Sequence, residues 1–173
     1  MRKLIGKRGQ FEISFSMIFS IIVIIAIVAT SFYVIRYFLN LNKCNEVAFF
    51  FNDFQNKVND AWRSGDTQST FESNLPGSVR AVCFGNYSLV APMGNTADAQ
   101  RYNELRDYVR TKRDKNLFIY PSSGSCDASI SYYNLQHSIP AAGQFFCVDT
   151  VNGKLDVKLS KTSSDPLVKL SKV

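Results

Sequence analysis

Four cysteines are the residues of this 173-residue chain whose type and spacing most clearly predict covalent chemistry. Cys44, Cys83, Cys126 and Cys147 all follow a long apolar segment, and none precedes it. In an oxidising compartment an even number of cysteines indicates disulfides, here two, and three pairings satisfy that count. A zinc site is the competing interpretation, but the spacings of 39, 43 and 21 residues contain no C-x2-C pair.

Residues that could carry out catalysis are scarce. The single histidine, His137 in NLQHSIP, has no nucleophile motif or carboxylate motif near it, and a histidine at a strand end is usually just partly exposed. The nine glycines are scattered, and no phosphate loop, H-E-x-x-H, EF-hand or paired-carboxylate pattern is present. The sequence therefore predicts a protein that is not an enzyme and that needs no cofactor or metal.

The segment DAQRYNELRDYVRTKRDK at 98–115 is the candidate contact surface. A stripe of Tyr102, Leu105 and Val109 predicts a helix, and Thr96 can cap it. The cations can meet nucleic acid, an acidic glycan or an acidic neighbouring subunit, and they are Arg101, Arg106, Arg110, Lys112, Arg113 and Lys115. Four interleaved acids can form local helical pairs, so a solvated charged face is the alternative interpretation.

One modification motif is present. Asn86-Tyr87-Ser88 is an N-glycosylation sequon, so Asn86 is a candidate acceptor if the domain is exported. Single sequons also occur often by chance.

An uncharged apolar run at residues 13–35 is the element that would place these residues in their compartment. A hydrocarbon core of roughly 30 Å needs about 20 apolar helical residues, and a lone strand would leave its backbone groups unpaired there. The run exceeds the roughly 7 to 15 residues of a signal core, and no A-x-A cleavage site follows it. We therefore expect a retained, single membrane-spanning helix.

The flanking charges predict the orientation of that helix. Arg2, Lys3, Lys7 and Arg8 precede the span, which places the N-terminus in the cytoplasm and the C-terminal domain outside the cell. These four cations make up most of the formal net charge of +6. The remaining charge gives no strong argument for nucleic-acid binding.

The N-terminus MRKLIGKRGQFEISFSMIF carries the most specific motif, a basic segment and Gly9 placed directly before the apolar helix. Over about residues 7–40 it resembles the class III signal peptide of type IV prepilins, archaeal ones above all. The resemblance implies cleavage after Gly9 by a prepilin peptidase, with Gln10 as the new N-terminus. Glu12 would be the acidic assembly residue, at the third mature position where many pilins have the fifth. The alternative is a glutamate that snorkels at the membrane interface.

The helix is predicted to continue well beyond the span. Neither Gly nor Pro occurs from Gln10 to Ser64, enough for one helix of about 80 Å at 1.5 Å per residue. Its outer part carries an apolar stripe to lay on a sheet, formed by Val47, Phe51, Phe54, Val58 and Ala61 or Trp62, and widened by Phe49 and Phe50. The expected divisions are a leader at 1–9, a transmembrane or filament-core helix at 10–43 and an extracellular head at 44–173.

The head is predicted to be α+β, with a mostly antiparallel sheet as in pilins. A polar turn is expected at 64–69, and strands are expected around 79–83 and at 116–120, 128–136, 144–150 and 154–161. Asn152-Gly153 predicts a hairpin between the last two strands, and Pro140–Gly143 predicts another turn.

Two functions fit these features. The first is a structural, pilin-like filament subunit whose partners are the membrane, copies of itself or related pilins, the prepilin peptidase and the assembly machinery. The alternative is a single-pass, membrane-anchored binding protein (adhesin, receptor or pseudopilin) that does not polymerise and whose ligand the sequence does not identify.

Overall fold

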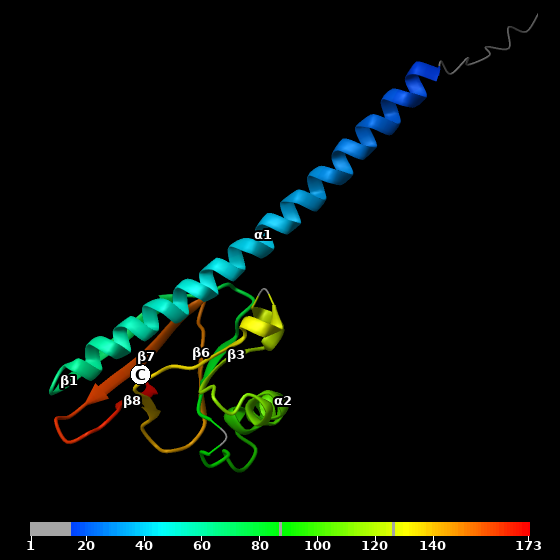
Figure 1. The fold of residues 1–173 in the computed structure, drawn as a ribbon. Helices are drawn as coiled ribbons and strands as arrows, with labels where there is room; N and C mark the ends of the chain where they lie inside the picture. Colours follow the sequence, from blue (N-terminus) through cyan, green and yellow to red (C-terminus); the bar gives the residue numbers. More distant parts are fainter. Residues whose placement is uncertain (1–14, 87, 126) are drawn as a thin grey trace, which may run out of the picture. The chain divides into compact units, whose positions relative to one another are not determined.

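The computed structural model describes residues 15–86, 88–125 and 127–173, which form two units (Figure 1). The first ends at Leu39 and the second is Asn40–Val173. Helix α1 (Phe15–Arg63) contributes to both units. The long uninterrupted helix predicted for residues 10–64 is thus observed over the described part of that range.

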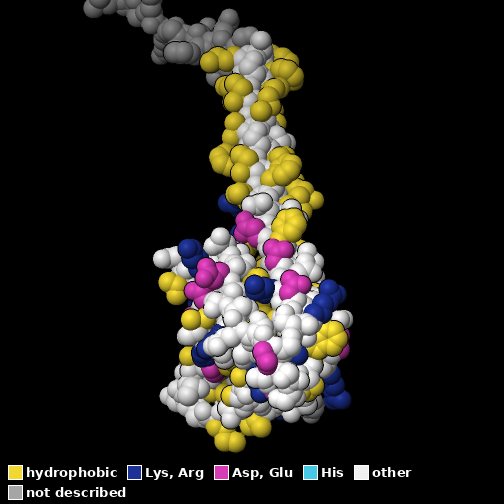
Figure 2. All heavy atoms as spheres, turned by 90° about the vertical axis from the view of Figure 1, so that its left-hand side faces the viewer, with side chains coloured by type: hydrophobic (Ala, Val, Ile, Leu, Met, Phe, Trp, Pro, Cys, Tyr) yellow, Lys and Arg dark blue, Asp and Glu magenta, His cyan; other side chains and the backbone are white. Residues whose placement is uncertain are grey.

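The first unit is an apolar stretch of helix whose described side chains, residues 15–39, are all exposed (Figure 2). Helix α1 is long and apolar enough to cross a membrane. Three of its hydroxyl groups, those of Ser20, Thr30 and Ser31, donate to its own backbone: Ser20 Oγ donates to the Ser16 carbonyl at 2.9 Å, and Ser31 Oγ donates to the Ile27 carbonyl at 2.7 Å. Because these hydroxyls need no outside partner, the helix surface suits lipid or apolar neighbours.

The second unit, which we call the head, contains two four-stranded sheets. The first has the order β1-β7-β8-β5, with β1 (Thr67–Asn74), β7 (Lys154–Lys161), β8 (Val168–Lys172) and β5 (Ser138–Pro140). The second has the order β4-β3-β2-β6, with β4 (Tyr132–Tyr133), β3 (Leu117–Tyr120), β2 (Ala81–Phe84) and β6 (Phe146–Asp149). Every strand pair is antiparallel except β5 with β8, so the mixed α+β prediction is confirmed.

The main core of the head forms between the outer part of α1 and both sheets. Phe54 lies at its centre, with its ring 4.6 Å from that of Phe71 on β1 and 5.7 Å from that of Phe84 on β2. The predicted stripe is buried as expected, with Ala61 rather than Trp62 as its last member. Phe49 differs from Phe50, because Phe49 remains 66% exposed whereas Phe50 is 1% exposed.

A second, smaller core lies on the opposite face of the second sheet. Helix α2 (Ala97–Thr111) packs there through Leu105 and Val109, which contact Cys83, Phe118 and their neighbours. Thr96 caps α2 by accepting a hydrogen bond from Ala99 N at 3.2 Å, as predicted. Since both faces of the sheet are covered, all four residues of β2 are buried.

Two local predictions for the head were wrong. Residues 64–69 were expected to form a turn only, yet β1 begins at Thr67 and continues to Asn74. This edge strand buries only Phe71 among mostly polar residues, so its alternation is hard to recognise. Residues 128–136 were expected to form one strand, but a 3-10 helix (Ala128–Ile130) occupies the beginning, where the Asp127 side chain accepts from Ser129 N at 2.7 Å.

The expected Asn152-Gly153 hairpin is only half correct. Both residues have positive φ, 53° and 79°, and Val151 and Lys154 form a bridge across the turn, as a tight turn requires. The strands then separate, because β6 joins the second sheet while β7 pairs with β1 and β8 in the first. The turn at Pro140–Gly143 is present, with Gly143 N donating to the Pro140 carbonyl at 3.0 Å.

Candidate functional site

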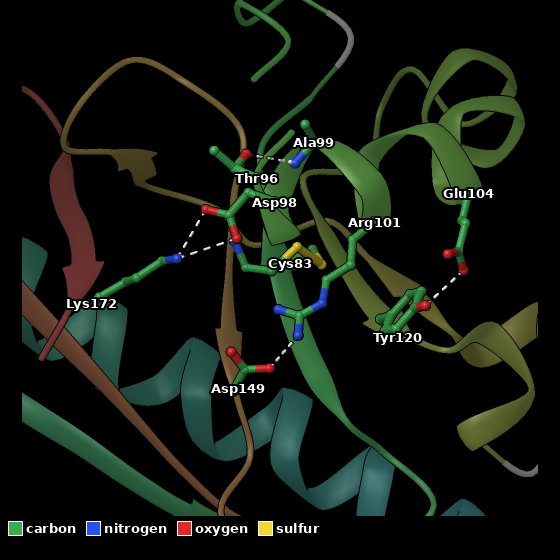
Figure 3. Close-up of a disulfide and its surroundings, with 10 residues drawn as sticks. Cys83, Thr96, Asp98, Ala99, Arg101, Glu104, Tyr120, Asp149 and Lys172 are labelled. Atoms are coloured by element: carbon green, nitrogen blue, oxygen red, sulfur yellow. Dashed lines mark hydrogen bonds and ion pairs between the residues drawn. A yellow bond between two sulfur atoms is a disulfide. The ribbon is translucent and has the colours of Figure 1, made fainter. Parts of the chain in front are cut away.

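A disulfide between Cys83 and Cys147 lies at the centre of the layer between the second sheet and α2 (Figure 3). The two residues are directly opposite in the β2–β6 register, and their Cα atoms are 3.9 Å apart. Both are fully buried. The prediction of a disulfide is confirmed for this pair. Cys44 is disulfide-bonded too, and Cys126 lies outside the described residues.

Asp98 connects three elements beside the disulfide (Figure 3). From the first turn of α2, its Oδ1 accepts from the backbone N–H of Cys147 on β6 at 3.3 Å. Lys172 on β8 donates to Oδ2 at 2.9 Å. A carboxylate at this position also interacts favourably with the positive end of the helix dipole. Asp98 therefore supplies an acceptor at the edge of the second sheet and attaches that sheet and α2 to the first sheet.

Arg101 points from α2 toward the sheet and pairs with Asp149 (Figure 3). Its guanidinium lies 5.6 Å from the ring centroid of Tyr120, and Tyr120 donates its hydroxyl hydrogen to Glu104 Oε2 at 2.7 Å. This hydrogen bond to Glu104 stabilises the protonated phenol and raises the pKa of Tyr120. Arg101 was predicted to belong to the contact surface, and the structure places it instead in a paired network against the sheet.

The other predicted contact cations divide into two groups. Lys112 is half-buried, with its ammonium 5.0 Å from the Tyr132 ring centroid, and Lys115 pairs with Asp114 at 2.7 Å. Arg106 and Arg110 on α2, and Arg113 just beyond its end, are exposed. The segment 98–115 therefore contains partly buried cations that contact other side chains of the head, and a separate set of exposed arginines.

A groove of about 410 Å³ opens next to Asp98 and Lys172. Its lining is largely apolar, and its polar members include the Asp98–Lys172 pair. The lining residues are Pro92, Met93, Thr96, Asp98, Ala141, Ala142, Gln144, Phe145, Phe146, Leu170, Ser171 and Lys172. A groove of this size and character can bind a small apolar group.

His137, the only histidine, lies away from this groove and stacks on Trp62 with ring centroids 3.9 Å apart. Within residues 15–86, 88–125 and 127–173, no group of three His, Cys, Asp or Glu side chains could hold a metal ion. The groove itself offers apolar contacts and the paired charges of Asp98 and Lys172.

The remaining predicted sites are placed as follows. Gly9, Gln10 and Glu12, the predicted leader and assembly residues, lie outside the described residues. Asn86 is half-buried, and its Oδ1 accepts from Ser88 N at 3.1 Å and Ser88 Oγ at 2.6 Å. This local arrangement joins the two ends of the sequon around Tyr87, which is not among the described residues.

Asp149 and Lys172 were missed by sequence reasoning, and Asp98 was noted only as a local helical charge. Asp98 and Lys172 are 74 residues apart in the chain, and Arg101 and Asp149 are 48 apart. Such pairs follow no periodic pattern, because only the tertiary fold brings them together. A weak signal exists in the position of Asp98 two residues after the helix cap.

Replacing Asp98 by alanine is expected to destabilise the head by about 1–3 kcal/mol, since Cys147 N–H would lose its acceptor in a buried setting. Asp98→Asn is the matched variant, because its amide oxygen can still accept from that N–H while the charge pair with Lys172 is lost. We expect the asparagine variant to lose clearly less stability in denaturant unfolding. Equal losses would assign the effect to the ion pair instead.

Comparisons with family models, with curated proteins and with solved structures find no match to this chain.

Proposed function

We propose that this chain is a type IV pilin-like subunit of a cell-surface filament. It spans the membrane once, with its N-terminus in the cytoplasm and its disulfide-containing head outside the cell. After removal of residues 1–9, the apolar part of α1 leaves the bilayer and packs against the same part of neighbouring subunits. In this role the protein is structural and performs no reaction.

The observation that carries the proposal is the exposure of every described side chain in residues 15–39. Large apolar residues cover this helix segment all round, and Figure 2 shows hydrophobic side chains along the face in view. Such a surface needs lipid or other helices around it. Lipid tails and neighbouring helices are similarly apolar, so the transfer from one to the other is governed by side-chain packing rather than by hydration.

The head supports the same placement. The buried Cys83–Cys147 disulfide fits an oxidising compartment, and it lies after the apolar helix in the chain. The basic residues before the helix favour the cytoplasm. Both features agree with a subunit whose leader is cut on the cytoplasmic side and whose head is displayed outside.

A second candidate, an anchored binding protein that does not polymerise, is favoured by two features of the head. These are the groove beside Asp98 and the exposed arginines of α2. The two candidates differ in what happens at Gly9, because an anchor needs no cleavage there.

The test is the mass of the N-terminal peptide of the native membrane protein, with the prepilin peptidase of the host present and absent. We expect a terminus at Gln10 that depends on the peptidase. Gly9→Val should block cleavage, whereas the matched Gly6→Val variant, also in the leader, should be cut normally. A chain that still starts at Met1 in every case would contradict the pilin pathway and leave the anchored binding protein.

Cleavage alone does not demonstrate polymerisation. Filaments sheared from cells should contain this chain when Gly9 is intact and lack it in the Gly9→Val variant. A cleaved protein that stays entirely in the membrane fraction would indicate a subunit of the assembly apparatus rather than of the filament.

A further inference from the structure

We propose that the arginine flank of α2, defined by Arg106 and Arg110, binds an acidic polysaccharide. The ligand class is a chain carrying carboxylate or sulfate groups. The inference depends on the proposed placement of the head outside the cell, where such polymers occur. It assigns a ligand to the protein and does not depend on whether the subunit polymerises.

The flank lies on a helix that is fixed to the rest of the head by packing and hydrogen bonds. Leu105 and Val109 anchor one side of α2 in the smaller core, and the Thr96 cap and the Asp98 contacts hold its N-terminal end. Arg106 and Arg110 are one helical turn apart and therefore neighbours on the helix surface. Because the helix is fixed, two guanidinium groups are presented together without ordering the backbone on binding.

None of the described ion pairs includes Arg106 or Arg110. The acids of this segment are occupied elsewhere: Asp98 binds Lys172, Glu104 accepts from Tyr120 and Asp114 pairs with Lys115. Asp107 is the remaining acid, and among the described ion pairs neither it nor Arg106 nor Arg110 takes part. Arg106 and Arg110 are therefore available to an outside anion.

Helix stability does not explain this arrangement. Like charges four residues apart destabilise a helix. A cation near the helix C-terminus is favoured by the dipole, which accounts for Arg110 in the last turn. Arg106 lies more than a turn before the end at Thr111, where that effect has faded. The pair at Arg106 and Arg110 thus fits recognition better than helix stabilisation.

The side chains around the flank favour a polysaccharide over a nucleic acid. Guanidinium groups match carboxylate and sulfate oxygens with two parallel hydrogen bonds. Stacking of bases requires open aromatic faces, but Tyr102 and Tyr108 of α2 both pack against the smaller core. Tyr102 has its ring 5.1 Å from that of Phe145. The flank therefore offers charge and hydrogen bonds without a stacking platform.

The test measures binding of the full chain in detergent micelles to heparin, polygalacturonate, neutral dextran and single-stranded DNA. We expect binding to the two acidic polysaccharides and none to dextran. The double variant Arg106→Gln, Arg110→Gln should weaken this binding about tenfold or more at low salt. The slope of log affinity against log salt concentration should also become smaller by about two, because about two fewer ions are released on binding.

The matched control is Arg63→Gln with Arg80→Gln, which removes two exposed arginines elsewhere on the head. This control variant should change the affinity for the acidic polysaccharides by less than about twofold. It removes the same amount of positive charge, but at positions outside the arginine flank. Equal weakening by both double variants would reduce the effect to net charge and overturn the proposal. Tighter binding of DNA through Arg106 and Arg110 would overturn it in favour of nucleic acid.

The result can be separated from the test of the proposed function. N-terminal cleavage and filament shearing are expected to be unchanged in the Arg106→Gln, Arg110→Gln variant. Loss of cleavage in the Gly9→Val variant should in turn leave polysaccharide binding by the purified protein intact. Failure of one proposal would therefore not imitate failure of the other.

Discussion

Replacing Phe54 with alanine is expected to lower the free energy of unfolding by about 3–5 kcal/mol. The side chain is fully buried, and its ring stacks on those of Phe71 at 4.6 Å and Phe50 at 5.8 Å. Alanine would leave a cavity where α1 meets both sheets, and the surrounding rings cannot all move to fill it. Because a domain of this kind is stable by about 5–15 kcal/mol, the loss is a large part of the total.

The measurement is denaturant unfolding of the full chain in detergent, followed by the fluorescence of Trp62. This is the only tryptophan, and it reports on the head because it stacks on His137 and donates to the Pro166 carbonyl at 3.1 Å. Phe49→Ala is the matched control on the same helix, since Phe49 is 66% exposed and should change stability by less than about 0.5 kcal/mol. A loss for Phe54→Ala as small as that of Phe49→Ala would contradict the placement of Phe54 at the centre of the core.

Removing the Cys83–Cys147 disulfide by two valine substitutions is expected to destabilise the head by about 4 kcal/mol. The cross-link spans a sequence separation of 64 residues, and chain entropy alone predicts roughly that amount for such a loop in the unfolded state. Valine approximately retains the buried volume between the sheet and α2, so the loss reports on the cross-link rather than on packing.

The matched variant carries alanine at both positions. It should lose the same cross-link and, in addition, about 1 kcal/mol or more for the space left under α2. Both losses are read from the same unfolding experiment in nonreducing buffer. A valine variant as stable as the native chain would mean that the disulfide contributes little and that packing alone holds this layer.

The elements that follow from local rules were predictable from the sequence. Helix α1 was predicted from the absence of Gly and Pro and from its apolar stripe. Helix α2 was predicted from the Thr96 cap and from the spacing of Tyr102, Leu105 and Val109. The helix was expected to extend to residue 115 but ends at Thr111, because the backbone of Lys112 leaves the helical conformation while its N–H still donates to the Tyr108 carbonyl. Boundaries of this kind depend on a few backbone bonds and are the least predictable feature.

The failures share a different cause, which is pairing between distant segments. β1 was missed because Thr67–Asn74 becomes a strand only through its partner β7, with Thr67 opposite Lys161 and Asn74 opposite Lys154. The hairpin at Asn152-Gly153 was half right because the local turn is encoded by those residues, while the choice of sheet is made by the rest of the fold.

The candidate site shows the same division. Its charged residues and cysteines were visible in the sequence, but their assignment to inner and outer faces was not. Arg101 and Arg106 looked equivalent, yet one pairs with Asp149 beneath α2 and the other is exposed. The difference arises from the position of each residue relative to the buried Leu105 side of the helix.

If the head is exported as we propose, its strand order limits when it can fold. In the first sheet β8, which comes last along the chain, lies between β7 and β5. Under that placement, β5 has no partner and part of the apolar stripe of α1 is uncovered until Val168–Lys172 have reached the outer side. Folding should therefore follow translocation rather than accompany it, and the emerging chain needs shielding beside the bilayer for that interval.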